Sequence, residues 1–176
     1  MNIGIEYLRI IQERFNGVKD LGDKALRQLE DEDIHWALNE GSNNIAIIVK
    51  HLSGNMISRW SDFLTSDGEK PNRNREQEFE DTLSSKQELM TTWETGWAIL
   101  FDALSSLSEQ DLLKIVTIRG EKHTVLDAIE RQLAHYAYHI GQLAFIGKQL
   151  KNENWESISI PKGQSEEYLQ QMLKRN

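Results

Sequence analysis

Apolar residues recur at three- and four-residue intervals along almost the whole chain, and only two prolines interrupt 176 residues. This spacing gathers apolar side chains on one face of a helix, and that face must be buried against another element. The length suits one compact domain over residues 1–176 rather than two. The pattern therefore predicts an all-α fold in which long helices form a four-helix bundle.

Four segments carry the helical period. We expect helices over about residues 3–30, 44–64, 78–107 and 124–150. Before the last of these, apolar and polar residues alternate from Lys114 to Arg119, which predicts a short extended segment.

Residues 151–176 read as a tail rather than a domain. Trp155, Ile158 and Ile160 are apolar enough for this tail to pack on the bundle. Pro161 and Gly163 mark a turn, and Ser165 can cap a short final helix. We expect that helix to lie across the bundle.

The net charge of −8 constrains the partners. Nucleic-acid binding needs a basic stripe, and the lysines and arginines form none, so a nucleic-acid partner is not expected. An anionic membrane surface is disfavoured for the same reason. No stretch reaches the roughly 18 apolar residues that a membrane-spanning helix needs, and the N-terminus lacks the pattern of a signal peptide. The expected location is the cytoplasm.

The chain contains no cysteine. Disulfides, cysteine-ligated zinc and a thiol nucleophile from the protein itself are therefore excluded. Any thiol chemistry must use an external thiol.

Three histidines carry most of the functional information. His135 and His139 are separated by four residues, so they project from one helix face, and His51 lies on a second helical segment. Three imidazoles on facing helices can hold one divalent cation and leave a position for water or substrate. The same helix faces carry further polar residues, namely Arg131, Gln142 and Asn55.

The spacing has an ordinary alternative. A His-x-x-x-His pair is short and common, and a histidine on a helix is more often packed or exposed than metal-bound. His35 follows an acidic turn and His123 precedes a helix cap, so both are expected at the surface and outside the ligand set.

Several ordered motifs resemble the DinB-like (YfiT-like) superfamily, which is named for damage-inducible bacterial proteins. The motifs are Trp36, Glu40–Ala46, His51-Leu52 and His135–Leu143. Members with this pattern are small four-helix bundles, often dimeric, with a divalent metal held by three histidines. The resemblance implies a homodimer with His51, His135 and His139 as ligands. Zinc or nickel is the first expectation for the metal, and iron or manganese also fits.

The same resemblance suggests a class of reaction, because characterised relatives include transferases that use bacillithiol, mycothiol or glutathione. A metal held by neutral ligands lowers the pKa of a bound thiol or water. The leading hypothesis is a metal-dependent S-transferase or hydrolase that acts on a small molecule, with a low-molecular-weight thiol or metal-bound water as nucleophile. Arg131 could orient a carboxylate of the thiol, or it could pair with Asp127 or Glu130. Asn55 and Gln142 could orient a ligand or bind its water.

Two other hypotheses belong to different classes. The bundle could be a non-catalytic module that binds a small molecule or serves a stress response. It could also be a purely structural homodimer with some of Trp60, Trp93 and Trp97 at the interface, although such tryptophans more often fill a core.

Overall fold

The computed structural model describes residues 2–174, and most of them lie in helices. The elements are α1 (Ile3–Arg27), α2 (Ile45–Trp60), α3 (Lys86–Ser106), β1 (Ile115–Ile118), β2 (Glu121–Thr124), α4 (Val125–Lys151) and α5 (Ser165–Leu173). This content agrees with the predicted all-α class. Within the described range, no helix has both the length and the apolar character needed to cross a membrane.

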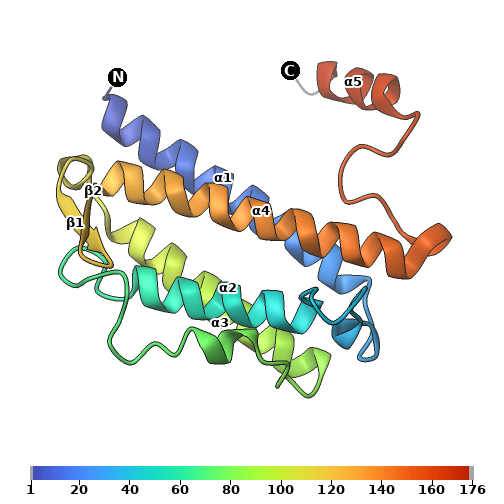
Figure 1. The fold of residues 1–176 in the computed structure, drawn as a ribbon. Helices are drawn as coiled ribbons and strands as arrows, with labels where there is room; N and C mark the ends of the chain where they lie inside the picture. Colours follow the sequence, from blue (N-terminus) through green and yellow to red (C-terminus); the bar gives the residue numbers. More distant parts are fainter. Residues whose placement is uncertain (1, 175–176) are drawn as a thin grey trace.

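The four long helices pack against one another (Figure 1). Helix α1 lies along α4, α2 lies along α3, and α2 also contacts α4. Gly96 lets α3 approach α2 closely, since a Cβ at this position would lie 2.9 Å from the Cα of Ser53. Helix α2 therefore stands between α3 and α4, with one side on the core and another facing α4.

Aromatic residues fill the core between these helices. Trp60, Trp93 and Trp97 are 2%, 1% and 1% exposed. The Trp60 indole donates a hydrogen bond to the Tyr136 hydroxyl, which donates to Oδ1 of Asn55, each over 3.0 Å. The hypothesis that these tryptophans form an interface is wrong, because they are buried within a single chain.

Two helix ends differ from the prediction. Helix α2 ends at Trp60 rather than near residue 64, because Asp62 adopts a positive φ of 48° that an α-helix cannot include. Helix α3 begins after Ser85, whose side chain caps its first turn. Glu78 and Phe79, predicted as the start of that helix, belong to a separate 3₁₀ turn, Glu76–Phe79.

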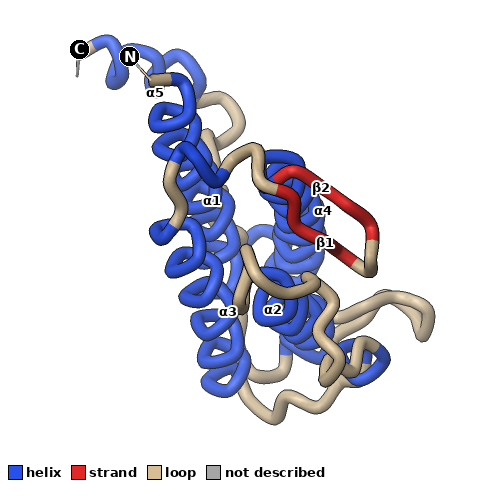
Figure 2. Tube along the Cα trace, turned by 90° about the vertical axis from the view of Figure 1, so that its left-hand side faces the viewer, coloured by secondary structure: helices blue, strands red, loops and turns tan. Residues whose placement is uncertain are grey.

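The extended segment expected before the last long helix is the first strand of an antiparallel hairpin. Gly120 occupies the turn with a φ of +76°, a conformation that favours glycine. The Asp67 carboxylate accepts hydrogen bonds from the backbone N–H groups of Arg119 and Gly120, both over 2.8 Å. These bonds fasten the loop after α2 to the hairpin, which lies beside the start of α4 (Figure 2).

The first part of the tail packs on the helices as expected at Trp155, whereas Ile160 is 44% exposed. The Trp155 ring lies against Gly147, where a Cβ would come within 2.8 Å of it. The Glu156 backbone also exchanges two hydrogen bonds with the Gln28 side chain, over 2.8 and 3.0 Å.

The second part of the tail does not match the prediction. Helix α5 has no buried residue, and Figure 1 shows it standing apart from the long helices. Gly163, with a φ of +85°, redirects the chain before this helix, and Leu169 and Leu173 are 49% and 60% exposed. The expectation that the final helix lies across the bundle is therefore wrong.

Candidate metal centre

Three histidines meet between α2 and α4. His51 comes from α2, while His135 and His139 come from successive turns of α4. Nε2 of His135 lies 3.4 Å from Nε2 of His51 and 3.1 Å from Nε2 of His139. One ligand nitrogen from each residue can be chosen so that all three lie within 4.8 Å of one another. The structure thus brings together the three residues that the sequence singled out.

The outer nitrogens of two of these rings have acceptor partners. Nδ1 of His51 lies 3.0 Å from Oε2 of Glu78, and Nδ1 of His139 lies 2.8 Å from Oε1 of Gln142. An oxygen acceptor requires the proton on Nδ1, so in the neutral ring Nε2 keeps its lone pair. The Nε2 lone pairs of His51 and His139 then both face the centre. Neutral His135 has one N–H proton and can donate it to only one of them. The arrangement therefore favours a cation between the rings.

Glu78 is itself held in place. It is 6% exposed, and its two oxygens accept hydrogen bonds from Nε and Nη2 of Arg73 over 2.7 and 2.8 Å. The carboxylate rests on the backbone of α2, where a Cβ on Gly54 would lie 2.5 Å from it. Burial alone would raise the pKa of Glu78, but the hydrogen bonds from His51 and Arg73 outweigh it and lower that pKa. Glu78 is thus an ionised, fixed acceptor for His51.

The centre disfavours protonated imidazole. Burial, together with the positive charge of the neighbouring histidines and of Arg59 and Arg73, lowers the pKa of His135 to about 3. Burial also lowers the pKa of His139, although its hydrogen bond to Gln142 opposes the shift. Both rings are therefore neutral at neutral pH, which is the form that binds metals.

This depression gives the metal-free protein an acid sensitivity. Below pH 6.5 the unfolded chain binds protons at His135 and His139 that the folded chain refuses, so stability falls as the pH falls. The ceiling is about 1.4 kcal/mol per pH unit for each group, and the partial exposure of His135 reduces its share. We expect urea unfolding of chelator-treated protein to show a lower free energy of unfolding at pH 5.5 than at pH 7.5. The difference should be on the order of 1.4 kcal/mol.

The variant His135→Gln provides the comparison, because glutamine does not titrate. It should lose part of the pH dependence between pH 7.5 and 5.5, a window above the ordinary range of carboxylates. Equal free energies of unfolding for the parent at both pH values would contradict the low pKa of His135.

The three polar residues predicted around the centre take different positions. Gln142 orients His139 as described above. Asn55 lies one helical turn from His51, but its Oδ1 accepts from Tyr136. Arg131 places Nη1 4.0 Å from the Glu121 carboxylate. The two acids first considered for it have other partners, since Asp127 contacts His123 and Glu130 accepts from Tyr7.

The other two histidines lie outside the group. His35 is exposed, as predicted, and its Nδ1 lies 2.9 Å from an Asp81 oxygen. The surface prediction is wrong for His123, whose side chain is only 10% exposed and whose Nδ1 lies 2.6 Å from Asp127.

Sequence reasoning missed the residues that support His51 from outside. Glu78 and Arg73 orient it, and Phe79 stacks on its ring with centroids 4.8 Å apart. The Arg75 guanidinium lies over the Phe79 ring, 5.0 Å from its centroid. All four lie between α2 and α3, where no helical period marks which side chains turn inward.

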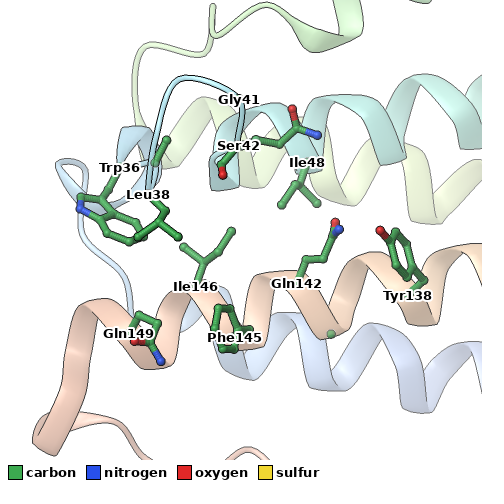
Figure 3. Close-up of a pocket in the computed structure, with 13 residues that line it drawn as sticks. Trp36, Leu38, Gly41, Ser42, Ile48, Tyr138, Gln142, Phe145, Ile146 and Gln149 are labelled. Carbon is green, nitrogen blue, oxygen red and sulfur yellow. The ribbon is translucent and has the colours of Figure 1, made fainter.

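An apolar groove opens beside the centre, towards the start of α2 (Figure 3). Its volume is about 680 Å³. Gln142, which holds His139, points into it from α4, and Ile48 faces it from α2. The large apolar residues that line it are Trp36, Leu38, Ile48, Tyr138, Phe145 and Ile146. A small molecule in this groove would lie beside Gln142, whose side chain is hydrogen-bonded to His139 of the centre.

Comparison with known proteins identifies the family. No curated protein and no solved structure matches the chain. A family model matches residues 2–164, which hold all four long helices and the three histidines. The chain therefore belongs to the family described as "Protein of unknown function (DUF1572)".

Proposed function

We propose that this protein is a metal-dependent enzyme in which His51, His135 and His139 hold one divalent cation. The convergence of the three Nε2 atoms carries the proposal, because hydrogen bonds at Nδ1 leave two of them as lone-pair donors. A tetrahedral zinc with Zn–N bonds of about 2.0–2.1 Å keeps its imidazole nitrogens about 3.4 Å apart. The separations of 3.4 and 3.1 Å at His135 are close to that requirement.

The donor set narrows the choice of metal. Three neutral imidazoles suit borderline cations, so zinc or nickel is proposed first, with iron or manganese as alternatives. A set of three protein ligands is typical of catalytic sites, which keep a position for substrate or water.

We place the chain in the DinB-like superfamily, with α1–α4 as its four-helix bundle. The order of Trp36, His51, His135 and His139 along the chain supports this placement, as does the pairing of α1 with α4 and α2 with α3. Proteins of that type suggest thiol transfer as the first reaction to test and hydrolysis as the second.

The cation and the residues of the chain would contribute different parts of the chemistry. A bound divalent cation would supply Lewis acidity and lower the pKa of a thiol or water beside it. Glu78 and Gln142 keep His51 and His139 in the tautomer that donates through Nε2. In thiol transfer, the thiol proton passes to solvent, a sulfur–carbon bond forms, and the leaving group departs with its electron pair. The chain has no cysteine, so the thiol is a separate small molecule.

An activity screen tests the proposal. Metal-free protein and protein loaded with zinc, nickel, iron or manganese would be assayed with bacillithiol, mycothiol or glutathione and a chromogenic electrophile, and with a panel of ester and amide substrates. We expect one metal to raise one of these rates at least tenfold over the metal-free protein, and His135→Ala to abolish the gain. Rates that stay at background for every fully loaded preparation would contradict an enzyme of either class.

The apolar groove favours a second candidate, a non-catalytic module that binds a small molecule, including one in a stress response. Its volume of about 680 Å³ lies within the range of ligand sites. This candidate predicts that an apolar ligand binds equally to the parent and to His135→Ala, whereas the enzyme proposal predicts that catalysis needs the intact centre.

A further inference from the structure

A second hollow lies on the other side of the centre, towards the end of α2. Its volume is about 220 Å³, and His51 and His135 form part of its wall. Among residues 2–174, five arginines and no acidic residue line it; the arginines are Arg59, Arg73, Arg75, Arg119 and Arg131. We call this hollow the arginine pocket. Such a concentration of positive charge is unexpected in a chain whose net charge is −8.

Nearby carboxylates balance only part of this charge. Glu69 is shared by three of the guanidinium groups, which lie within 3.0 to 3.2 Å of its Oε2. Glu78, which is buried, is the second acid and pairs with Arg73. Apart from exposed acids, only two carboxylates among the described residues thus lie close to the five guanidinium groups.

The two remaining arginines are loosely paired. Arg75 lies 3.8 Å from Glu76, and Arg131 lies 4.0 Å from Glu121, at the limit of an ion pair. These two acids are 88% and 73% exposed, so water screens both contacts. Arg75 and Arg131 are themselves about half exposed, at 48% and 46%, so a dissolved anion can reach both.

A buried polar atom in the wall also lacks a partner. Arg59 is 5% exposed, and among the described residues its Nε has no hydrogen-bond acceptor. Burial lowers the pKa of Arg59, and the charges of Arg73 and Arg119 add to that effect against the pairing with Glu69. Holding these cations together is unfavourable without further negative charge.

We infer that the arginine pocket binds a carboxylate or phosphate group of the small molecule that reacts at the histidine centre. Guanidinium groups present paired N–H donors that match both anions. Since His51 and His135 belong to the same wall, an anion held there would place the rest of the molecule beside the centre. This inference rests on the proposed function and specifies its substrate class as anionic.

Calorimetric titration of an anionic probe into the protein tests the inference. The protein is first treated with a chelator, because a bound metal could itself bind the anion. The probes are inorganic phosphate and succinate at low ionic strength. We expect at least one to bind the parent with a dissociation constant in the millimolar range or tighter. Arg131→Gln and Arg75→Gln should each weaken that binding about tenfold. Tighter binding of phosphate would indicate a phosphate site, and tighter binding of succinate would indicate a carboxylate site.

The matched control is Arg9→Gln. Arg9 is also about half exposed, at 52%, but it lies on α1 and pairs with Glu6 and Glu13 outside the pocket. Its variant should bind the probe as the parent does, and all variants should keep the parent's circular dichroism and melting temperature. The inference is overturned if the parent binds neither anion at tens of millimolar, or if Arg131→Gln and Arg9→Gln behave alike.

Metal content measured on the same preparations separates this inference from the proposed function. One metal per chain without arginine-dependent anion binding would overturn the inference alone. Arginine-dependent anion binding in a chain that takes up no metal would overturn the metal proposal and leave an anion-binding pocket.

Discussion

Replacing Glu78 with alanine is expected to lower the free energy of unfolding by about 3 kcal/mol and to weaken metal binding roughly 10- to 100-fold. The stability loss arises because Arg73, with a side chain only 4% exposed, loses the carboxylate that neutralises it. Its remaining contact with Glu69 at 3.2 Å keeps the loss near the lower end for a broken buried pair. The affinity loss arises because His51 no longer has a fixed tautomer.

Two variants separate these effects. Glu78→Gln keeps an acceptor for His51 but removes the charge, so it should retain more metal affinity than Glu78→Ala. Glu76→Ala lies in the same turn but is 88% exposed, and its stability should stay within about 0.5 kcal/mol of the parent. Urea unfolding and competitive zinc titration provide the two measurements. A Glu78→Ala protein as stable as Glu76→Ala, with undiminished affinity, would show that Glu78 supports neither the fold nor the centre.

Much of the helical framework was predictable because it depends on short-range regularities. The spacing of apolar residues indicates the four long helices, and the cap at Thr124 marks where the last of them begins. The four-residue separation of His135 and His139 already places both rings on one face. Gln142, one turn further along α4, could be assigned to His139 for the same reason.

The outer support of His51 could not be predicted, because it comes from a segment without a period. Glu78 and Arg73 are two charged residues in a charged connection, and only the folded chain turns them towards α2. Predicting Glu78 as the start of a helix hid its role. The arginine pocket escaped notice for a related reason, since its five members come from α2, α4, the hairpin turn and the loop between α2 and α3.

The exposed position of α5 has a similar explanation. Its sequence carries apolar residues at helical spacing, which predicts an amphipathic helix but not the surface that receives it. Trp155 was placed correctly because a large aromatic side chain near the end of α4 can reach the helices directly.

Removing a histidine of the centre is expected to have the largest effect on metal binding. Loss of an outer partner alone costs roughly 10- to 100-fold, and loss of a direct ligand exceeds that. His51→Ala and His139→Ala should therefore fall below detectable binding at micromolar metal. His51 and His139 are buried, but alanine favours the helix at either position, so both variants should keep their helical content. His35→Ala is the matched control, because His35 is an exposed histidine paired with Asp81.

The metal centre itself is tested by elemental analysis of the tagless protein after loading with zinc, nickel, iron and manganese in turn. We expect about one ion of at least one metal per chain in the parent and in His35→Ala, and less than about one tenth of that in His51→Ala and His139→Ala, with unchanged circular dichroism. A parent that retains none of the four metals, or histidine variants that retain as much as the parent, would contradict a metal centre at these residues.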